Sequence, residues 1–148
     1  MPYGAQSTNV AALSESGFKS VRGALTEGRF LTFELGGYAL TNGGGDGFTA
    51  TKVSAGHGDV AQWWVVHALD VDDAGSTFNI SSAKDGRYIG SHTSLVNHVT
   101  GAEIYNIGFA AGQGYSLQKE NGDYVTVDGN GEVQITNKVV YFGVFSVT

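Results

Sequence analysis

The chain has 148 residues, no cysteine and a net charge of −6 at pH 7. This length suits one domain with its own core, and the missing cysteines exclude a disulfide framework, a thiol nucleophile and a cysteine-based metal site. The eight lysines and arginines are scattered, which makes nucleic acid a poor partner, and no apolar run is long enough to insert into a membrane as a helix.

Residues 1–17 are small and polar without a clear period, so we expect an arm or a linker remnant there. The start of the sequence lacks the charged and apolar segments of a signal peptide. From residue 18 onward, short alternating segments separated by turns predict a single all-β domain over residues 18–148. The 23 glycines, against one proline, fit a fold with many tight turns.

One short motif occurs three times, as Glu27-Gly28-Arg29-Phe30-Leu31, Asp85-Gly86-Arg87-Tyr88-Ile89 and Asn121-Gly122-Asp123-Tyr124-Val125. Each copy joins a turn residue and a glycine to an aromatic-aliphatic pair. Glycine reaches the positive φ of a tight hairpin turn, and the following pair suits a strand. We therefore expect three hairpins, with backbone glycines in the turns and the three aromatic residues in the core.

Alternating segments around these turns predict three units of four strands, over residues of about 18–73, 74–110 and 111–148. The first unit is expected to hold strands at 20–25, 29–33, 38–41 and 62–67, and the second at 78–81, 87–90, 94–96 and 104–107. The third is expected to hold strands at 115–118, 124–127, 133–136 and 141–147. Three units of four strands predict a β-trefoil, because the alternative β-sandwich has no reason to repeat one hairpin three times.

The stretch Gln62-Trp63-Trp64 resembles the Gln-x-Trp signature of ricin-type lectin repeats, in which the tryptophan packs into the core. The corresponding segments of the other units are expected to be Glu103-Ile104-Tyr105 and Tyr141-Phe142-Gly143, which lack the motif. We expect Trp64 in the core and Trp63 on the outside, where its ring would stack on a sugar.

A sugar pocket needs an aromatic face for the pyranose ring and Asp, Asn or His side chains for its hydroxyls. The turns of every unit offer such residues, although the same residue types also build turns and fill cores. The candidates are Tyr38, Asn42 and Asp46 in the first unit, His92, Asn97, His98, Tyr105 and Asn106 in the second, and Asp128, Asn130 and Asn137 in the third.

Motifs for other chemistry are missing from the sequence. Asp70 to Gly75 begins like a calcium loop, but its twelfth position is Ser81 where a glutamate is needed. There is no zinc motif, no nucleophile elbow and no phosphate loop, so we predict no metal, no cofactor and no catalytic residues. Asn79-Ile80-Ser81 is a sequon, and alternation predicts that the Asn79 side chain faces outward, where an N-linked glycan would be accommodated if the chain is secreted.

The segments 17–30 and 37–42 resemble the C-terminal region of fungal secreted phospholipases C, the phosphoesterase-family enzymes of the non-haemolytic or phosphatidylglycerol-specific type. The segments 78–82, 85–89 and 141–147 fit the same region. The resemblance implies an extracellular accessory domain whose catalytic domain lies upstream in a longer parent chain. It assigns no functional residue to this sequence.

We expect, from these observations, a non-catalytic, lectin-like module that binds a glycan or glycoconjugate beside a secreted hydrolase. The alternative is a protein-interaction or protease-inhibitor-like trefoil, for which the insertion at 43–59 would be the exposed loop. A third hypothesis is that the domain is a part of the hydrolase needed for its phosphodiesterase activity.

Overall fold

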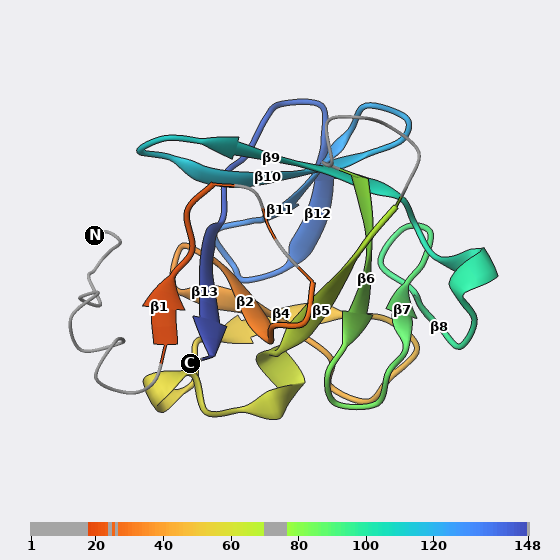
Figure 1. Cartoon of the computed structure of the whole chain (residues 1–148), viewed down its shortest axis with the longest axis horizontal. Coiled ribbons are helices and arrows are strands. Elements are labelled where there is room, and N and C mark those ends of the chain that lie inside the picture. The colour runs from red at the N-terminus through yellow and green to blue at the C-terminus, as the bar shows by residue number, and fades with distance from the viewer. Residues whose placement is uncertain (1–17, 24, 26, 70–76, 148) are drawn as a thin grey trace.

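The computed structural model describes residues 18–23, 25, 27–69 and 77–147, so the expected arm at 1–17 and the acidic stretch at 70–75 lie outside it. The described chain is all-β, as predicted, with thirteen strands and three short 3-10 helices (Figure 1). None of those helices, η1 (Ala55–His57), η2 (Val60–Gln62) and η3 (Val99–Gly101), is long and apolar enough to cross a membrane. The strands are β1 (Phe18–Ser20), β2 (Leu31–Leu35), β3 (Tyr38–Thr41), β4 (Thr49–Lys52), β5 (Trp64–Ala68), β6 (Thr77–Ser82), β7 (Tyr88–Ile89), β8 (Leu95–Val96), β9 (Tyr105–Ala110), β10 (Gly114–Lys119), β11 (Tyr124–Val127), β12 (Val133–Thr136) and β13 (Gly143–Val147).

Antiparallel pairing connects all of these strands. The main order is β1-β13-β2-β5-β6-β9-β10-β11-β12, and the hairpins β3–β4 and β7–β8 branch from β2 and β6. One further bridge joins Tyr115 on β10 to Phe142, the residue before β13. The backbone N–H of each residue donates to the carbonyl of the other, over 2.8 and 2.7 Å. The last strand is therefore held next to β10 as well as next to β1 and β2.

Three pairs of large side chains recur where neighbouring strands meet. Leu31 lies opposite Trp64, Phe78 opposite Tyr105, and Tyr115 opposite Phe142, and all six are at most 1% exposed. These pairs form the centre of one continuous core.

The core position predicted for Trp64 is confirmed, and its indole N–H donates to the carbonyl of Leu40 over 2.9 Å. The recurring pairs align Trp64 with Tyr105 and with Phe142. The expected alignment of Gln62-Trp63-Trp64 with Tyr141-Phe142-Gly143 is therefore wrong by one residue.

Strands of the second and third units lie within a few residues of their predicted positions, but the first unit differs. The strand predicted at 20–25 is wrong, because β1 ends at Ser20 and residues 21–23 and 25 belong to no strand. β2 takes the place of an opening strand, and Gly36 and Gly37 form its turn into β3. Tyr38, rather than Phe30, is thus the counterpart of Tyr88 and Tyr124 at the start of the second strand of a hairpin.

The glycines of the repeated motif have positive φ, as expected, with values of 84° at Gly28, 80° at Gly86 and 95° at Gly122. The prediction that Phe30 lies in the core is wrong, since 46% of its surface is exposed. Gly28 forms a turn before β2 and not within a hairpin, so the residue two places after it is not aimed at the core. The same local motif therefore occurs in two structural contexts, before a strand at Gly28 and in a hairpin turn at Gly86 and Gly122.

Candidate functional site

The recurring core pairs define three equivalent places on the outer side of the sheet. Next to each pair, in antiparallel register, one outward-facing residue from each of three neighbouring strands forms a row. We call these rows the first, second and third outer face. The first holds Phe30, Val65 and Ser81, the second Thr77, Asn106 and Gln118, and the third Gly114, Gly143 and Glu34.

The second outer face is hollow. Thr77 on β6 lies opposite Asn106 on β9, and Asn106 lies opposite Gln118 on β10. These three polar residues therefore form one row over three neighbouring strands. Tyr124, half-buried on β11, lies opposite Gln118 and extends the row. A pocket of about 360 Å³ lies over these strands, within the size range of small-ligand sites. Its lining residues are Thr77, Ile104, Asn106, Gln118, Lys119, Glu120 and Gly122.

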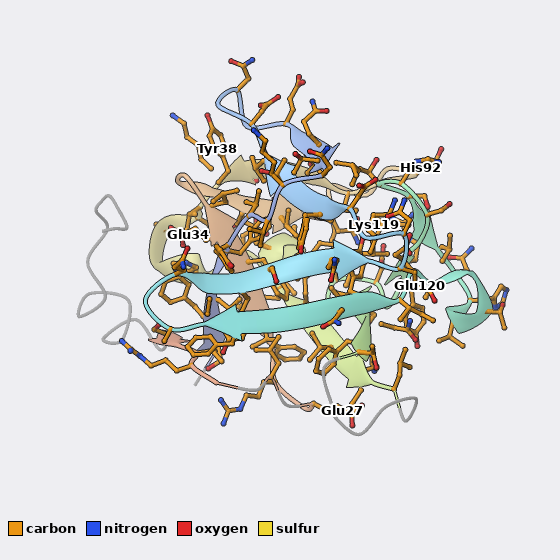
Figure 2. The ribbon with its side chains drawn as sticks, turned by 90° about the horizontal axis from the view of Figure 1, so that it is seen from above. Glu27, Glu34, Tyr38, His92, Lys119 and Glu120 are labelled. Atoms are coloured by element: carbon orange, nitrogen blue, oxygen red, sulfur yellow. The ribbon has the colours of Figure 1, made fainter. Side chains whose placement is uncertain are left out.

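The lining residues of this pocket combine several kinds of hydrogen-bonding group. Asn106 is exposed, and the half-buried Gln118 amide donates to the carbonyl of Gly122 over 3.2 Å. Lys119 and Glu120 lie where β10 ends and the turn to β11 begins (Figure 2). Ile104 supplies the apolar part. Amide, hydroxyl and charged groups beside an apolar surface suit a small polyhydroxylated ligand.

The first outer face is occupied by aromatic rings. Phe30 stacks on Trp63, with ring centroids 5.6 Å apart and planes inclined by 22°. The indole N–H of the half-buried Trp63 donates to the carbonyl of His57 over 2.8 Å. Farther along the same side of the sheet, the His67 ring lies 5.5 Å from that of Tyr88. This face therefore offers a ring surface where the second outer face offers a polar pocket.

The third outer face is covered by the loop that contains η1. His57 is fully buried, and its Nε2 lies 3.1 Å from Oε2 of Glu34, which is 6% exposed. The His57 ring also lies 5.3 Å from that of Phe145. The insertion of the first unit thus packs onto the third outer face, whereas the second outer face carries a pocket.

The predicted ligand residue Tyr105 lies in the core and is fully buried. Burial raises the pKa of its hydroxyl, and the nearby Glu103 carboxylate raises it further. Among the described residues the hydroxyl has no hydrogen-bond partner. The expectation that Tyr105 binds a surface ligand does not fit this position.

Replacing Tyr105 by phenylalanine tests its structural role. A buried hydroxyl without a partner carries a desolvation cost, so Tyr105→Phe should raise the free energy of unfolding by about 1 kcal/mol. Urea denaturation of both proteins measures this change. A lower stability of the variant would mean that the hydroxyl is bonded in solution.

The predicted ligand residue Asn42 is also fully buried and links two units. Its Nδ2 donates to Oγ of Ser82 over 2.9 Å, and its Oδ1 accepts from the N–H of Gly44 and from Nη2 of Arg87, over 2.9 and 3.3 Å. Partial burial opposes ionisation of Asp85, but hydrogen bonds from Asn42 and Arg87 together hold its pKa below the usual value. These contacts make Asn42 a structural residue.

The remaining candidates do not form one cluster with the pocket residues. Tyr38 is half-buried and packs over Gly131, where an added Cβ would overlap its ring. Asp128 accepts the backbone N–H groups of Glu132 and Asn130, which hold its pKa below the usual value, so it is a turn residue. The other candidates are exposed on loops: Asp46, His92, Asn97, His98, Asn130 and Asn137. Asn106 is the one predicted residue that lines the pocket.

Asn79 lies on the outer side of β6, opposite to the core residues Phe78 and Ile80, but it is not exposed. Its side chain is 5% exposed, and Nδ2 donates to the carbonyl of Glu103 over 3.1 Å. A glycan on this nitrogen would have to displace that contact. Alternation gives the side of the sheet correctly, but it does not show that the pairing of β9 with β6 brings residue 103 over this side.

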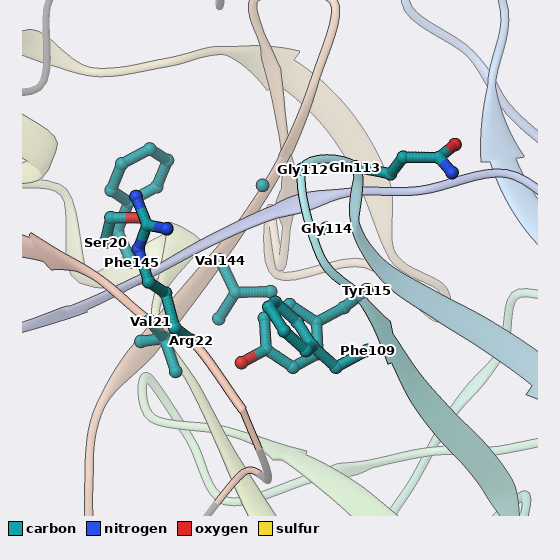
Figure 3. Close-up of a pocket in the computed structure, with 11 residues that line it drawn as sticks. Ser20, Val21, Arg22, Phe109, Gly112, Gln113, Gly114, Tyr115, Val144 and Phe145 are labelled. Atoms are coloured by element: carbon teal, nitrogen blue, oxygen red, sulfur yellow. The ribbon is translucent and has the colours of Figure 1, made fainter.

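A second pocket, of about 210 Å³, lies between the β9–β10 turn and the segments at 20–22 and 143–145 (Figure 3). The rings of Phe109 and Tyr115 form part of its wall, with centroids 5.0 Å apart. The Tyr115 hydroxyl donates to the carbonyl of Gly23 over 2.5 Å. None of the predicted residues lines this pocket, and its polar side chains, Ser20, Arg22 and Gln113, come from two separate segments.

Several pocket residues were missed by sequence reasoning: Thr77, Ile104, Gln118, Lys119 and Glu120. The sequence predicts that Gln118 is the polar last residue of a strand. It does not show which residues lie next to Gln118, because these depend on which strands pair. The register that brings Thr77 next to Asn106 is a long-range property. Only Asn106 carried a usable signal, as a polar residue directly after a core aromatic one.

Within the part of the chain that the structure describes, no three His, Asp or Glu side chains come together to hold a metal ion. Comparison of the sequence with protein-family models and with curated proteins gave no match.

Proposed function

We propose that this chain is a non-catalytic carbohydrate-binding module with a β-trefoil fold. The strand pairs support the fold, because β2, β5, β6, β9, β10 and β13 follow one another and the Tyr115–Phe142 bridge joins β10 back to β13. Three hairpins, β3–β4, β7–β8 and β11–β12, branch from alternate members of this set. A closed arrangement of this kind would protect the sheet edges. The three repeats would begin at β2, β6 and β10.

The observation that carries the proposed activity is the second outer face. Thr77, Asn106 and Gln118 lie in one row over three strands, beneath a pocket of about 360 Å³. Sugar hydroxyls both donate and accept hydrogen bonds, and amides and hydroxyls do the same. The equivalent positions of the other faces hold Phe30 and Val65, or two glycines and a covered Glu34. We therefore expect one such pocket per chain.

The protease-inhibitor alternative receives less support, because the long insertion is tied down. The Gln62 amide donates to Oγ1 of Thr51 and to the carbonyl of Lys52, both over 2.9 Å, and its oxygen accepts the N–H of Ser54. A protease-binding loop needs to stand clear of its scaffold. A carbohydrate-binding module beside the catalytic domain of a secreted hydrolase would hold that enzyme at a glycan surface.

Replacing two pocket residues tests the proposal. A glycan array identifies a soluble oligosaccharide that the whole chain binds, and calorimetry measures its affinity. Asn106→Ala and Gln118→Ala should each weaken binding about fivefold, because each removes hydrogen bonds worth about 1 kcal/mol in total. Asn137→Ala is the matched control, since Asn137 is also exposed but lies away from the pocket. Unchanged affinity in both pocket variants, or folded protein that binds no glycan, would rule the site out.

A further inference from the structure

We propose that Phe30, backed by Trp63, forms a second carbohydrate-binding surface, on which the pyranose rings of a polysaccharide chain stack. This inference rests on the proposed carbohydrate-binding function but concerns a different surface, the first outer face. The ligand class follows from the size of the surface: one exposed ring contacts one pyranose ring at a time, so measurable retention requires a polymer that presents many such rings at high local concentration.

Phe30 presents a ring surface to the solvent. It is 46% exposed, although one of its sides is stacked on Trp63 at an interplanar angle of 22°. Phe109, which is 40% exposed, is instead tilted by 46° against Tyr115. The C–H groups on one side of a pyranose ring pack well on an aromatic face that is open to the solvent.

The ring surface is held in place before any ligand arrives. Trp63 donates its indole N–H to the carbonyl of His57, and the His57 ring is fixed by its contact with the buried Glu34 carboxylate. The stack thus connects to the core through two successive polar contacts. A preformed aromatic surface loses little conformational freedom on binding, which favours affinity.

Polar groups for the sugar hydroxyls lie on the same side of the sheet. Ser81, in the row of Phe30, is buried at 7% exposed, and its Oγ lies 2.7 Å from Nε2 of His67. The half-buried His67 is therefore the polar group that this pair presents at the surface. Tyr88, opposite Ser81 on the neighbouring strand, is half-buried. Phe30 and Thr77 occupy equivalent positions in the fold. The first outer face therefore has an aromatic surface at the place where the second outer face has a polar pocket.

A pull-down experiment with insoluble chitin, cellulose and β-1,3-glucan tests this inference. On the polysaccharide that retains the wild-type chain, Phe30→Ala should lower the bound fraction at limiting polymer about three- to tenfold, the loss expected for one aromatic contact. Phe30→Tyr keeps the ring and should bind normally. Phe109→Ala, which removes another exposed aromatic side chain, is the matched control and should also bind normally.

The results separate the ring surface from the pocket. Asn106→Ala should lose soluble oligosaccharide but keep most binding to the polymer, while Phe30→Ala should do the reverse. If Phe30→Ala, with an unchanged thermal unfolding midpoint, binds the polymer like the wild type, the ring surface is wrong and the pocket stands. If the wild-type chain binds neither soluble oligosaccharide nor polymer, the carbohydrate-binding function itself is overturned.

Discussion

Gly114→Ala should lower the free energy of unfolding by about 4 kcal/mol, the sum of backbone strain and overpacking at one site. Gly114 has a φ of +122°, which side-chain-bearing residues rarely adopt, and its added Cβ would overlap the carbonyl oxygen of Phe142. That oxygen accepts the N–H of Tyr115. The substitution therefore acts on the bridge that joins β10 to the segment before β13.

Gly112→Ala is the control for this experiment. Gly112 lies in the same turn and has a φ of +81°, but an added Cβ there would meet nothing within 4 Å. Gly112→Ala should lower the free energy of unfolding by about 1–2 kcal/mol, which is the cost of placing a side chain on a backbone with positive φ. Urea denaturation of both variants gives the comparison. If both variants lose the same free energy of unfolding, the close contact between Phe142 and residue 114 does not destabilise Gly114→Ala.

Asn42→Ala should lower the free energy of unfolding by about 3 kcal/mol, because the side chain makes three hydrogen bonds in the interior. The variant loses the bonds to Ser82 and Arg87 that connect the first unit to the second, and the bond to Gly44 within the first unit. It also removes a hydrogen bond that favours ionised Asp85. Because the pKa of Asp85 is lowered in the folded protein, its ionised form stabilises the fold at pH values above the ordinary pKa. This stabilisation is lost as the pH falls through the lowered pKa. The variant lacks part of this contribution, so its free energy of unfolding should fall less on acidification.

Asn97→Ala is the matched control, since Asn97 is exposed. It should unfold like the wild type, within about 0.5 kcal/mol. If Asn42 were instead a ligand residue, Asn42→Ala would lose glycan affinity while keeping its stability. Thermal unfolding and calorimetry on the same preparations distinguish the two roles.

Local rules predicted the all-β character and most strand positions. Around Asn121-Gly122 the turn and both flanking strands follow from turn chemistry and alternation, which involve near neighbours only. The same rules misplaced Phe30, because nothing local distinguishes a glycine in a hairpin turn from one that precedes a strand. Tertiary pairing decided between the two.

The candidate site was less predictable than the fold. Asn106 was predicted as one of several polar and aromatic candidates in the second unit, but its partners Thr77 and Gln118 lie on other strands. Asn42 and Asn106 are the same residue type and each follows a buried residue, yet one is fully buried and the other exposed. Their difference arises from contacts with Ser82 and Arg87, which are far away in the sequence.

The position of β13 has a consequence for how the protein is made. β2 is among the first strands to be synthesised, but its neighbour β13 follows only after all other described strands. During translation one edge of β2 therefore stays unpaired until the end, and it is a place where nascent chains can associate wrongly. Folding that depends on such distant pairing is slow, so we expect recovery of soluble protein to depend on chaperones and on the rate of translation.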